Sequence, residues 1–414
     1  MKRTVSLTGC LAALIVAAGS AQAPTFQVEA LWPRPFPVAK HWILGSVTGV
    51  ATDARDHIFV VHRGVDSLQA NEKGPTLEPW ASQCCFSAPQ LLEFDAAGTL
   101  VASWDPKGGS GYDWPTNPSG IAVDGKGNIW IGSGLLPTAL PAGRGRGPAP
   151  EGAAGTPAAG RGRGDAAAGR GDAAAGRGDA AAGRGDAAAA QGRGGAARGG
   201  APAAPPRPPD AQVLEFDKTG KFVKQIGKAG QTDAGAKTNL ERPLGVAVDD
   251  AANEVYVADD GHGRIAVFDA NTGAFKREWK ANGDPFKTIS CVTIAKDGNV
   301  YVCDRNNNRI QVFDKTGKFV KEGFVAKTTQ GDGSVWDIAF SRDAQQANLY
   351  VADGHNKKIW ILNRGTLETV GSFGDGGRLP GHFYGVSSVA TDSKGNVYTG
   401  ETYEGKRVQK FVKK

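Results

Sequence analysis

The chain has 414 residues, of which 40% are hydrophobic and 22% charged, a composition typical of a globular protein. Its formal net charge of +6 comes from two short parts of the chain. Lys2 and Arg3 contribute +2, and the segment 137–210, with ten arginines against five aspartates and one glutamate, contributes +4. The rest of the chain is close to neutral. This balance argues against a nucleic-acid-binding face on the folded part, so we expect no nucleic acid among its partners.

The first 23 residues have the pattern of a signal peptide. Two basic residues precede an apolar run at 11–18, and Ala21–Ala23 has the small-x-small form that a signal peptidase cuts. The apolar run is too short for a transmembrane anchor, and no later segment is apolar enough to span a bilayer. We therefore expect an exported protein, periplasmic or extracellular, without membrane insertion.

The remaining chain, residues 24–414, is built from a repeated unit of three short strands joined by tight turns. Each copy thus has an apolar first strand, a second strand and a third strand. Five of the six copies also have a fourth strand. Counted on Tyr256, Tyr301, Tyr350 and Tyr398, the last four copies recur at 45, 49 and 48 residues, the period of a propeller blade. The six second strands are expected at 57–61, 128–131, 254–258, 299–303, 348–352 and 396–399.

The sixth copy ends at Lys414 before its fourth strand, whereas the mature N-terminus opens with an alternating strand at 26–32 that has no blade of its own. We expect this strand to complete the last blade, because closing the ring removes an exposed sheet edge. The sequence thus predicts an all-β fold: a six-bladed β-propeller with four-stranded antiparallel blades, in a single domain that we expect to be monomeric.

Blade two is interrupted by a low-complexity segment at 137–210, rich in Gly, Ala and Arg. It contains four Gly-Arg-Gly-Asp-Ala-Ala-Ala heptads and almost no large apolar residue, so we expect it to be disordered. Arg-Gly-Asp is also an adhesion tripeptide, which raises the hypothesis of a surface interaction protein. Expansion of a tolerated loop is the alternative.

Two cysteine pairs remain after cleavage at Ala23. Cys84 and Cys85 are adjacent in a loop, and Cys291 and Cys303 flank the Asp297–Gly298 turn at nearly equal distances. If that hairpin has a three-residue loop, the second pair faces across neighbouring strands and an oxidising compartment permits a disulfide. A pair of buried thiols is the alternative.

In an antiparallel blade, the start of the first strand and the end of the second lie on the same face, so one mouth of the ring gathers residues from every blade. Long loops above this face are where binding usually resides. The arginines there suit a carboxylate or another anion, since guanidinium offers a bidentate fork. We expect a ligand site composed of Arg63, Arg305, Ser119, Ser290, Ser387, His262 and Trp336. A metal site would need histidines that converge, and His62, His262 and His355 follow second strands of alternate blades.

The repeats resemble NHL repeats, with Asn-Val-Tyr-Val-x-Asp followed by Asn-x-Arg-Ile-x-x-Phe. The segments 49–51, 61–64, 304–306 and 309–311 further resemble the peptidyl-α-hydroxyglycine α-amidating lyases and their bacterial relatives. This resemblance implies a six-bladed propeller with arginines in the mouth, matched by Arg63 and Arg305, which are then also the candidate catalytic groups. It further implies a central zinc held by three histidines from alternate blades.

In this chain, the three positions of the zinc-binding histidines are occupied by Ser119, Ser290 and Ser387. The loop 259–263, where the family has a tyrosine in the mouth, contains no tyrosine. Neutral hydroxyls are poor zinc ligands. Our first hypothesis is therefore a binding module for a small anion or a peptide end. The alternative is a peptidylamidoglycolate lyase-like enzyme with an altered zinc or calcium site, and the sequence leaves the question of enzymatic activity open.

Overall fold

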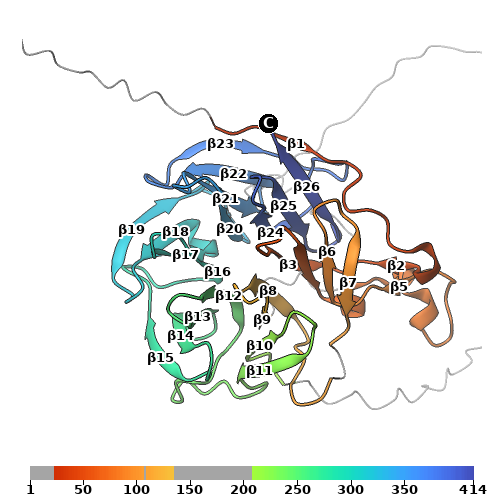
Figure 1. Ribbon diagram of the computed structural model, residues 1–414, viewed down its shortest axis with the longest axis horizontal. Coiled ribbons are helices and arrows are strands. Elements are labelled where there is room, and N and C mark those ends of the chain that lie inside the picture. The colour runs from red at the N-terminus through yellow and green to blue at the C-terminus, as the bar shows by residue number, and fades with distance from the viewer. Residues whose placement is uncertain (1–22, 107–108, 135–207) are drawn as a thin grey trace, which may run out of the picture. The chain divides into compact units, whose positions relative to one another are not determined.

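The repeats form six four-stranded antiparallel sheets within the part of the chain that the structure describes (Figure 1). The structure is a computed structural model that describes residues 23–106, 109–134 and 208–414. The expected signal peptide and the Arg-Gly-Asp heptads lie outside these residues, apart from Ala23. The predicted fold class is confirmed.

Blades one to five each run outward from the first strand to the fourth in chain order, and blade six does so for its first three strands. Blade one contains β3 (Val47–Thr52), β4 (Ile58–His62), β6 (Leu91–Phe94) and β7 (Leu100–Trp104). Blade two contains β8 (Pro118–Val123), β9 (Ile129–Ser133), β10 (Gln212–Phe216) and β11 (Phe222–Gly227). Blade three contains β12 (Pro243–Asp249), β13 (Glu254–Asp259), β14 (Arg264–Asp269) and β15 (Phe275–Trp279).

The second half of the ring follows the same order. Blade four contains β16 (Ile289–Ile294), β17 (Val300–Asp304), β18 (Arg309–Phe313) and β19 (Phe319–Phe324). Blade five contains β20 (Asp337–Phe340), β21 (Asn348–Asp353), β22 (Lys358–Asn363) and β23 (Thr369–Phe373). Blade six contains β24 (Val386–Thr391), β25 (Val397–Glu401), β26 (Val408–Lys413) and, from the other end of the chain, β1 (Phe26–Val28).

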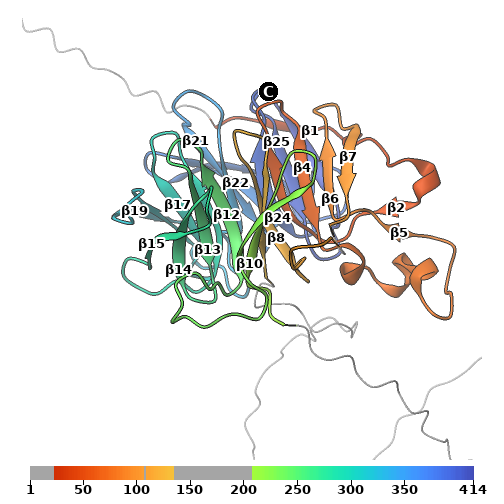
Figure 2. The ribbon, with the colours of Figure 1, turned by 60° about the horizontal axis from the view of Figure 1, so that its bottom comes forward.

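The first strands form the inner ring. Strands β3, β8, β12, β16, β20 and β24 each pack against the next, and β24 packs against β3. They surround the centre in Figure 1, and Figure 2 shows the blades side by side from another direction. Because β1 pairs with β26, with Phe26 opposite Lys413 and Val28 opposite Phe411, the predicted ring closure is confirmed.

Local sequence explains the turns between strands. In blade four, the Asp314 carboxylate accepts hydrogen bonds from the backbone N–H groups of Thr316 (2.8 Å) and Lys318 (3.0 Å). Gly317 takes a φ of +90°, a conformation that suits glycine. An aspartate followed three residues later by glycine therefore specifies the hairpin.

The repeated tyrosines form the core between blades. Tyr256, Tyr301, Tyr350 and Tyr398 are at most 1% exposed. Tyr301 packs edge-on against Phe340 of the next blade, with ring centroids 5.1 Å apart. Burying an aromatic side chain contributes roughly 2–3 kcal/mol, so these contacts join each blade to its neighbour. The period that identified the repeat thus marks core residues.

The remaining elements lie in the long connection of blade one and at strand ends. They are β2 (Trp42–Ile43), β5 (Phe86–Ser87), and the 3-10 turns η1 (Val38–Lys40), η2 (Gly64–Ser67), η3 (Ala70–Glu72), η4 (Gly74–Thr76) and η5 (Arg305–Asn307). Among the residues that the structure describes, no helix could cross a membrane. Disulfides join Cys84 to Cys85 and Cys291 to Cys303, the latter across directly paired positions of β16 and β17.

Candidate functional site

The inner ring encloses a cavity of about 300 Å³ that runs along the first strands. Six of the seven ligand-site residues expected from the sequence line it: Arg63, Ser119, Ser290, Arg305, Trp336 and Ser387. The seventh, His262, is not among the lining residues. Its ring lies 2.8 Å from the Asp259 carboxylate and 2.9 Å from the Thr232 carbonyl oxygen, so it stabilises the loop after β13.

Arg305 is the central cation of the mouth. It is 1% exposed, and the carbon of its guanidinium group lies 3.4 Å from the centroid of the Trp336 ring. Its Nε donates to the Asp332 carbonyl oxygen, and Nη2 forms an ion pair with the Asp332 carboxylate at 3.5 Å. Neither Nη1 nor Nη2 has a hydrogen-bond partner among the described residues. Buried donors without partners are costly, so these amino groups would gain from an acceptor on a ligand.

Tyr403 completes the surroundings of Arg305. Its hydroxyl donates to the Asp332 carboxylate at 3.1 Å, and its ring stands edge-on to Trp336 with centroids 6.1 Å apart. Burial and the Asp332 carboxylate raise the pKa of Tyr403, so the phenol is neutral and can act as a hydrogen-bond donor. The loop 259–263 lacks the mouth tyrosine of the amidating lyase family, but Tyr403 of blade six places a phenol in the mouth.

Arg63 lies at the junction of two cavities. It lines the channel and also a neighbouring polar cavity of about 240 Å³, which Tyr403, Asn117 and Lys406 line as well. Its Nε is buried and has no hydrogen-bond partner among the described residues. Burial lowers the pKa of Arg63, with opposing effects from Tyr403 and Asp210. The mouth therefore contains two guanidinium groups that retain unused donors.

The channel serines connect blades. Ser290 Oγ donates to the Val335 carbonyl oxygen at 3.0 Å, and Ser387 Oγ donates to the Val47 carbonyl oxygen at 2.9 Å. Thr48, at the same position in blade one, donates to the Pro118 carbonyl oxygen at 2.7 Å. Each acceptor immediately precedes the equivalent residue of the following blade. The hydroxyls of Ser290 and Ser387 thus act as inter-blade hydrogen-bond donors, which does not fit the role of zinc ligands.

The three histidines weighed as metal ligands do not form a metal-binding group within the described residues. His62 is fully buried, its Nδ1 accepts hydrogen bonds from the backbone N–H groups of Gly45 and Gly64, and its Nε2 lies 2.9 Å from the Pro89 carbonyl oxygen. Both ring nitrogens are therefore in use. Burial lowers its pKa to about 4, so His62 is neutral and structural. His355 is exposed.

Acidic residues at the ends of second strands are likewise occupied. The Asp304 carboxylate accepts from the Lys287 backbone and from Arg309, and Asp353 accepts from Asn356 and Trp360. A cluster of Asp53, His57 and Glu93 has metal-like spacing, but Arg55 forms ion pairs with both of its carboxylates. Neither set therefore offers a free calcium site.

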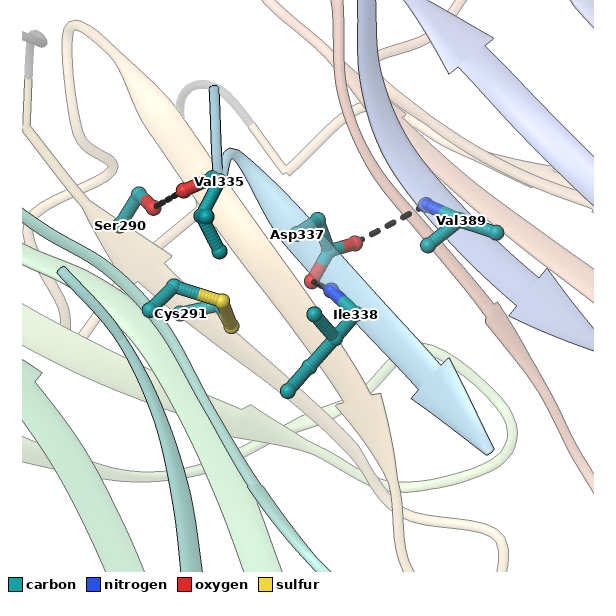
Figure 3. The surroundings of a disulfide bond; sticks show 7 residues. Ser290, Cys291, Val335, Asp337, Ile338 and Val389 are labelled. Carbon is teal, nitrogen blue, oxygen red and sulfur yellow. Dashed lines mark hydrogen bonds between the residues drawn. A yellow bond between two sulfur atoms is a disulfide. The ribbon is translucent and has the colours of Figure 1, made fainter. Parts of the chain in front are cut away.

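Asp337 is the acid of the channel wall. Its two carboxylate oxygens accept from the backbone N–H groups of Ile338 and Val389, both at 2.9 Å, and Figure 3 shows the carboxylate between these donors. The second donor belongs to blade six, so this contact also joins blades. Burial raises the pKa of Asp337 to about 7, against the opposing effect of the two N–H groups. It is therefore partly protonated at neutral pH.

Sequence reasoning missed Asp337 and Tyr403. A signal for Asp337 was present, because the equivalent positions of the other five blades hold small residues: Gly49, Gly120, Gly245, Cys291 and Ser388. An acid at a position otherwise occupied by glycine, cysteine or serine stands out. Tyr403 had no comparable signal, since it lies in a turn after β25 whose path depends on the folded ring.

The comparisons with known proteins agree with the repeat pattern. The NHL repeat model matches residues 240–268 and 286–313, which lie in blades three and four. The chain is an NHL-repeat propeller. The matched segments cover the first three strands of each blade, and the remaining blades of this NHL propeller repeat the same strand order with other sequences.

Curated relatives match a part of this propeller. NHL repeat-containing protein 3 of Mus musculus is 27% identical over 175 residues, covering 39% of this chain and 46% of the relative. Its Homo sapiens counterpart is 26% identical over 174 residues, covering 38% and 44%. Peptidyl-glycine alpha-amidating monooxygenase of Mus musculus is 24% identical over 156 residues, covering 36% and 16%. The chain thus aligns with less than half of each of these relatives, and resembles the amidating lyase family.

Two solved structures show a low similarity to this chain. Kuenenia stuttgartiensis hydrazine synthase matches 45% of this chain and 49% of its own with a TM-score of 0.35 and 16% identity. A structural genomics protein of unknown function from Bacteroides thetaiotaomicron matches 90% and 70% with a TM-score of 0.47 and 11% identity.

Proposed function

We propose that this NHL propeller is a binding module for a small carboxylate or a peptide end, held at the mouth of the central channel. The observation that supports this most is the Arg305 guanidinium, which is stacked on Trp336 and has two amino groups without hydrogen-bond partners among the described residues. A carboxylate accepts two parallel N–H bonds from such a fork.

Arg63 and Tyr403 support the same proposal. Both line the polar cavity that adjoins the channel, and the Arg63 Nε is a further unused donor. Asp332, the acid that pairs with Arg305, is partly accessible, and its ion pair involves only Nη2. Arg305 also lines the channel, so an anion in the channel would meet its guanidinium group.

Calorimetric titration with butyrate and with butyramide tests the proposal. The two ligands have the same shape, but butyramide lacks the charge that guanidinium recognises. We expect butyrate to bind at least tenfold more tightly at pH 7. Equal affinities, or no binding of butyrate, would overturn the proposal.

A second candidate is a lyase of the peptidylamidoglycolate type. It is favoured by Tyr403, which places a phenol beside the two mouth arginines, although this tyrosine comes from blade six and not from the loop 259–263. The serine hydroxyls do not fit the zinc of that family, so we derive no step through a metal. Elemental analysis of the purified protein for zinc and calcium, together with an assay on a peptidyl-α-hydroxyglycine, tests this candidate.

We further propose export, since disulfides such as Cys291–Cys303 persist in oxidising compartments. The Arg-Gly-Asp heptads remain a separate hypothesis. It predicts that deleting residues 137–207, outside the described part of the chain, abolishes binding to a partner surface while the propeller stays folded.

A further inference from the structure

The channel contains a carboxyl group that the proposed anion site does not use. Asp337 directly follows Trp336, the ring on which Arg305 stacks, and both residues line the same cavity. Each Asp337 oxygen accepts one backbone N–H. A carboxylate oxygen accepts more than one hydrogen bond, so both oxygens can still receive a donor from the channel.

The inner strands beside Asp337 carry no charge. Strand β16 reads Ile-Ser-Cys-Val-Thr-Ile and β24 reads Val-Ser-Ser-Val-Ala-Thr. Strand β21, its partner within the blade, has one acid at its end, Asp353, which is already bonded to Asn356 and Trp360. Among the described residues, the three strands that pack most closely against β20 therefore supply no cation to Asp337.

The other charged residues that line the cavity are three arginines. Arg63 and Arg305 lie at the mouth. Arg342 follows β20 toward the opposite end, where its Nε and Nη2 donate to the Thr391 carbonyl oxygen and its Nη2 to the Thr52 hydroxyl. The channel thus has an anion-accepting mouth and, further in, a carboxyl group held without a cationic partner.

A half-buried carboxylate without a cation is costly, and a ligand ammonium would offset that cost. Resting on the proposed function, we propose that the ligand is a zwitterionic amino carboxylate, with its carboxylate at Arg305 and its ammonium at Asp337. The cavity volume of about 300 Å³ suits a small molecule of this kind.

Calorimetry with matched ligand pairs tests the inference. The amino acids run from glycine through β-alanine and 4-aminobutyrate to 6-aminohexanoate, and each is compared with the carboxylate that carries a methyl group in place of the ammonium. At pH 8, where Asp337 is ionised, we expect at least one amino acid to bind tenfold more tightly than its methyl counterpart. If no amino acid binds more tightly than its counterpart, the inference is overturned while the anion site stands. If no carboxylate of either kind binds, the proposed function fails.

The variant Asp337→Asn assigns the effect to this residue. Asparagine keeps one oxygen for a backbone N–H, so we expect a folded protein that binds the methyl carboxylates as before and loses the tenfold preference. The matched control, Asp297→Asn, removes an exposed carboxylate that pairs with Arg364 on the surface and should keep the preference. Preference retained by Asp337→Asn would overturn the assignment.

Proton release on ligand binding can be measured on the wild-type protein, so this test does not require that the variant folds. At pH 7 the ammonium should displace about half a proton from Asp337, since the carboxyl is half protonated near its pKa. The binding enthalpy of the preferred amino acid should then vary with the ionisation enthalpy of the buffer, and that of its methyl counterpart should not. Absence of this difference would contradict the inference.

Discussion

The guanidinium of Arg305 lies over the indole of Trp336, with 3.4 Å between the guanidinium carbon and the ring centroid. The two residues come from neighbouring blades, Arg305 after β17 and Trp336 before β20. Trp336 is itself held by its Nε1, which donates to the Gly333 carbonyl oxygen at 2.8 Å. This stack fixes the direction of the unused donors, and several consequences can be measured.

Replacing Arg305 should separate stability from binding. The variant Arg305→Met keeps a long apolar side chain on Trp336 and removes a buried cation whose Nη1 and Nη2 have no hydrogen-bond partner among the described residues. We expect the free energy of unfolding to rise by about 1 kcal/mol while butyrate binding is lost. Urea denaturation measures the first effect, and a loss of more than 1 kcal/mol would show that Arg305 is primarily structural.

Asp337 should give stability a characteristic pH dependence. Its folded pKa, about 7, lies above the usual value for an unfolded aspartate, near 4, so the folded state binds the proton more tightly. The contribution of Asp337 to the free energy of unfolding is fully present below about pH 4, decreases as the pH rises through 7 and is constant above. The free energy changes by at most about 1.4 kcal/mol per pH unit.

The measurement is the difference in unfolding free energy between wild type and Asp337→Asn from pH 4 to pH 8. We expect wild type to lose stability relative to the variant as the pH rises through this window. Parallel curves for the two proteins would mean that Asp337 is ionised throughout.

The channel serines should contribute to stability and not to metal binding. Ser290→Ala and Ser387→Ala each remove one inter-blade hydrogen bond, which we expect to cost about 1 kcal/mol. Ser372→Ala, at an exposed position of the outer strand β23, is the matched control and should have no effect. Zinc content should be the same in all variants; a decrease with either channel variant would revive the lyase candidate.

Ring closure by the N-terminal strand β1 should contribute measurably to the free energy of unfolding. Phe26 packs on Tyr350 of blade five, with ring centroids 5.5 Å apart, and on Phe373 at 4.7 Å. We expect Phe26→Ala to lower the free energy of unfolding by about 2–3 kcal/mol. Gln27→Ala, at an exposed position of the same strand, should change it by less than about 0.5 kcal/mol. Equal effects would mean that β1 contributes only backbone pairing.

The sequence was sufficient for the fold because its signals are local and repeated. Turn residues, apolar alternation and the spacing of the tyrosines determined six blades and the closing strand. The same blade geometry brought Arg63, Ser119, Ser290, Arg305, Trp336 and Ser387 to one cavity.

Roles within the site depended on contacts that no local pattern encodes. The sequence made His62 and His262 candidate metal ligands. In the structure, their ring nitrogens are hydrogen-bonded to nearby backbone and carboxylate groups. Asp337 became significant because the strands on either side of it are uncharged, and Tyr403 because its turn folds back toward Arg305.

The most direct test of the anion site is the affinity for butyrate, measured by calorimetry, of wild type, Arg305→Gln and Arg342→Gln. Both arginines line the channel, but the Arg342 guanidinium already donates to Thr391 and Thr52. We predict at least a tenfold loss of affinity for Arg305→Gln, which corresponds to about 1.4 kcal/mol, and no change for Arg342→Gln. Unchanged affinity in Arg305→Gln, or an equal loss in both variants, would contradict an anion site at Arg305.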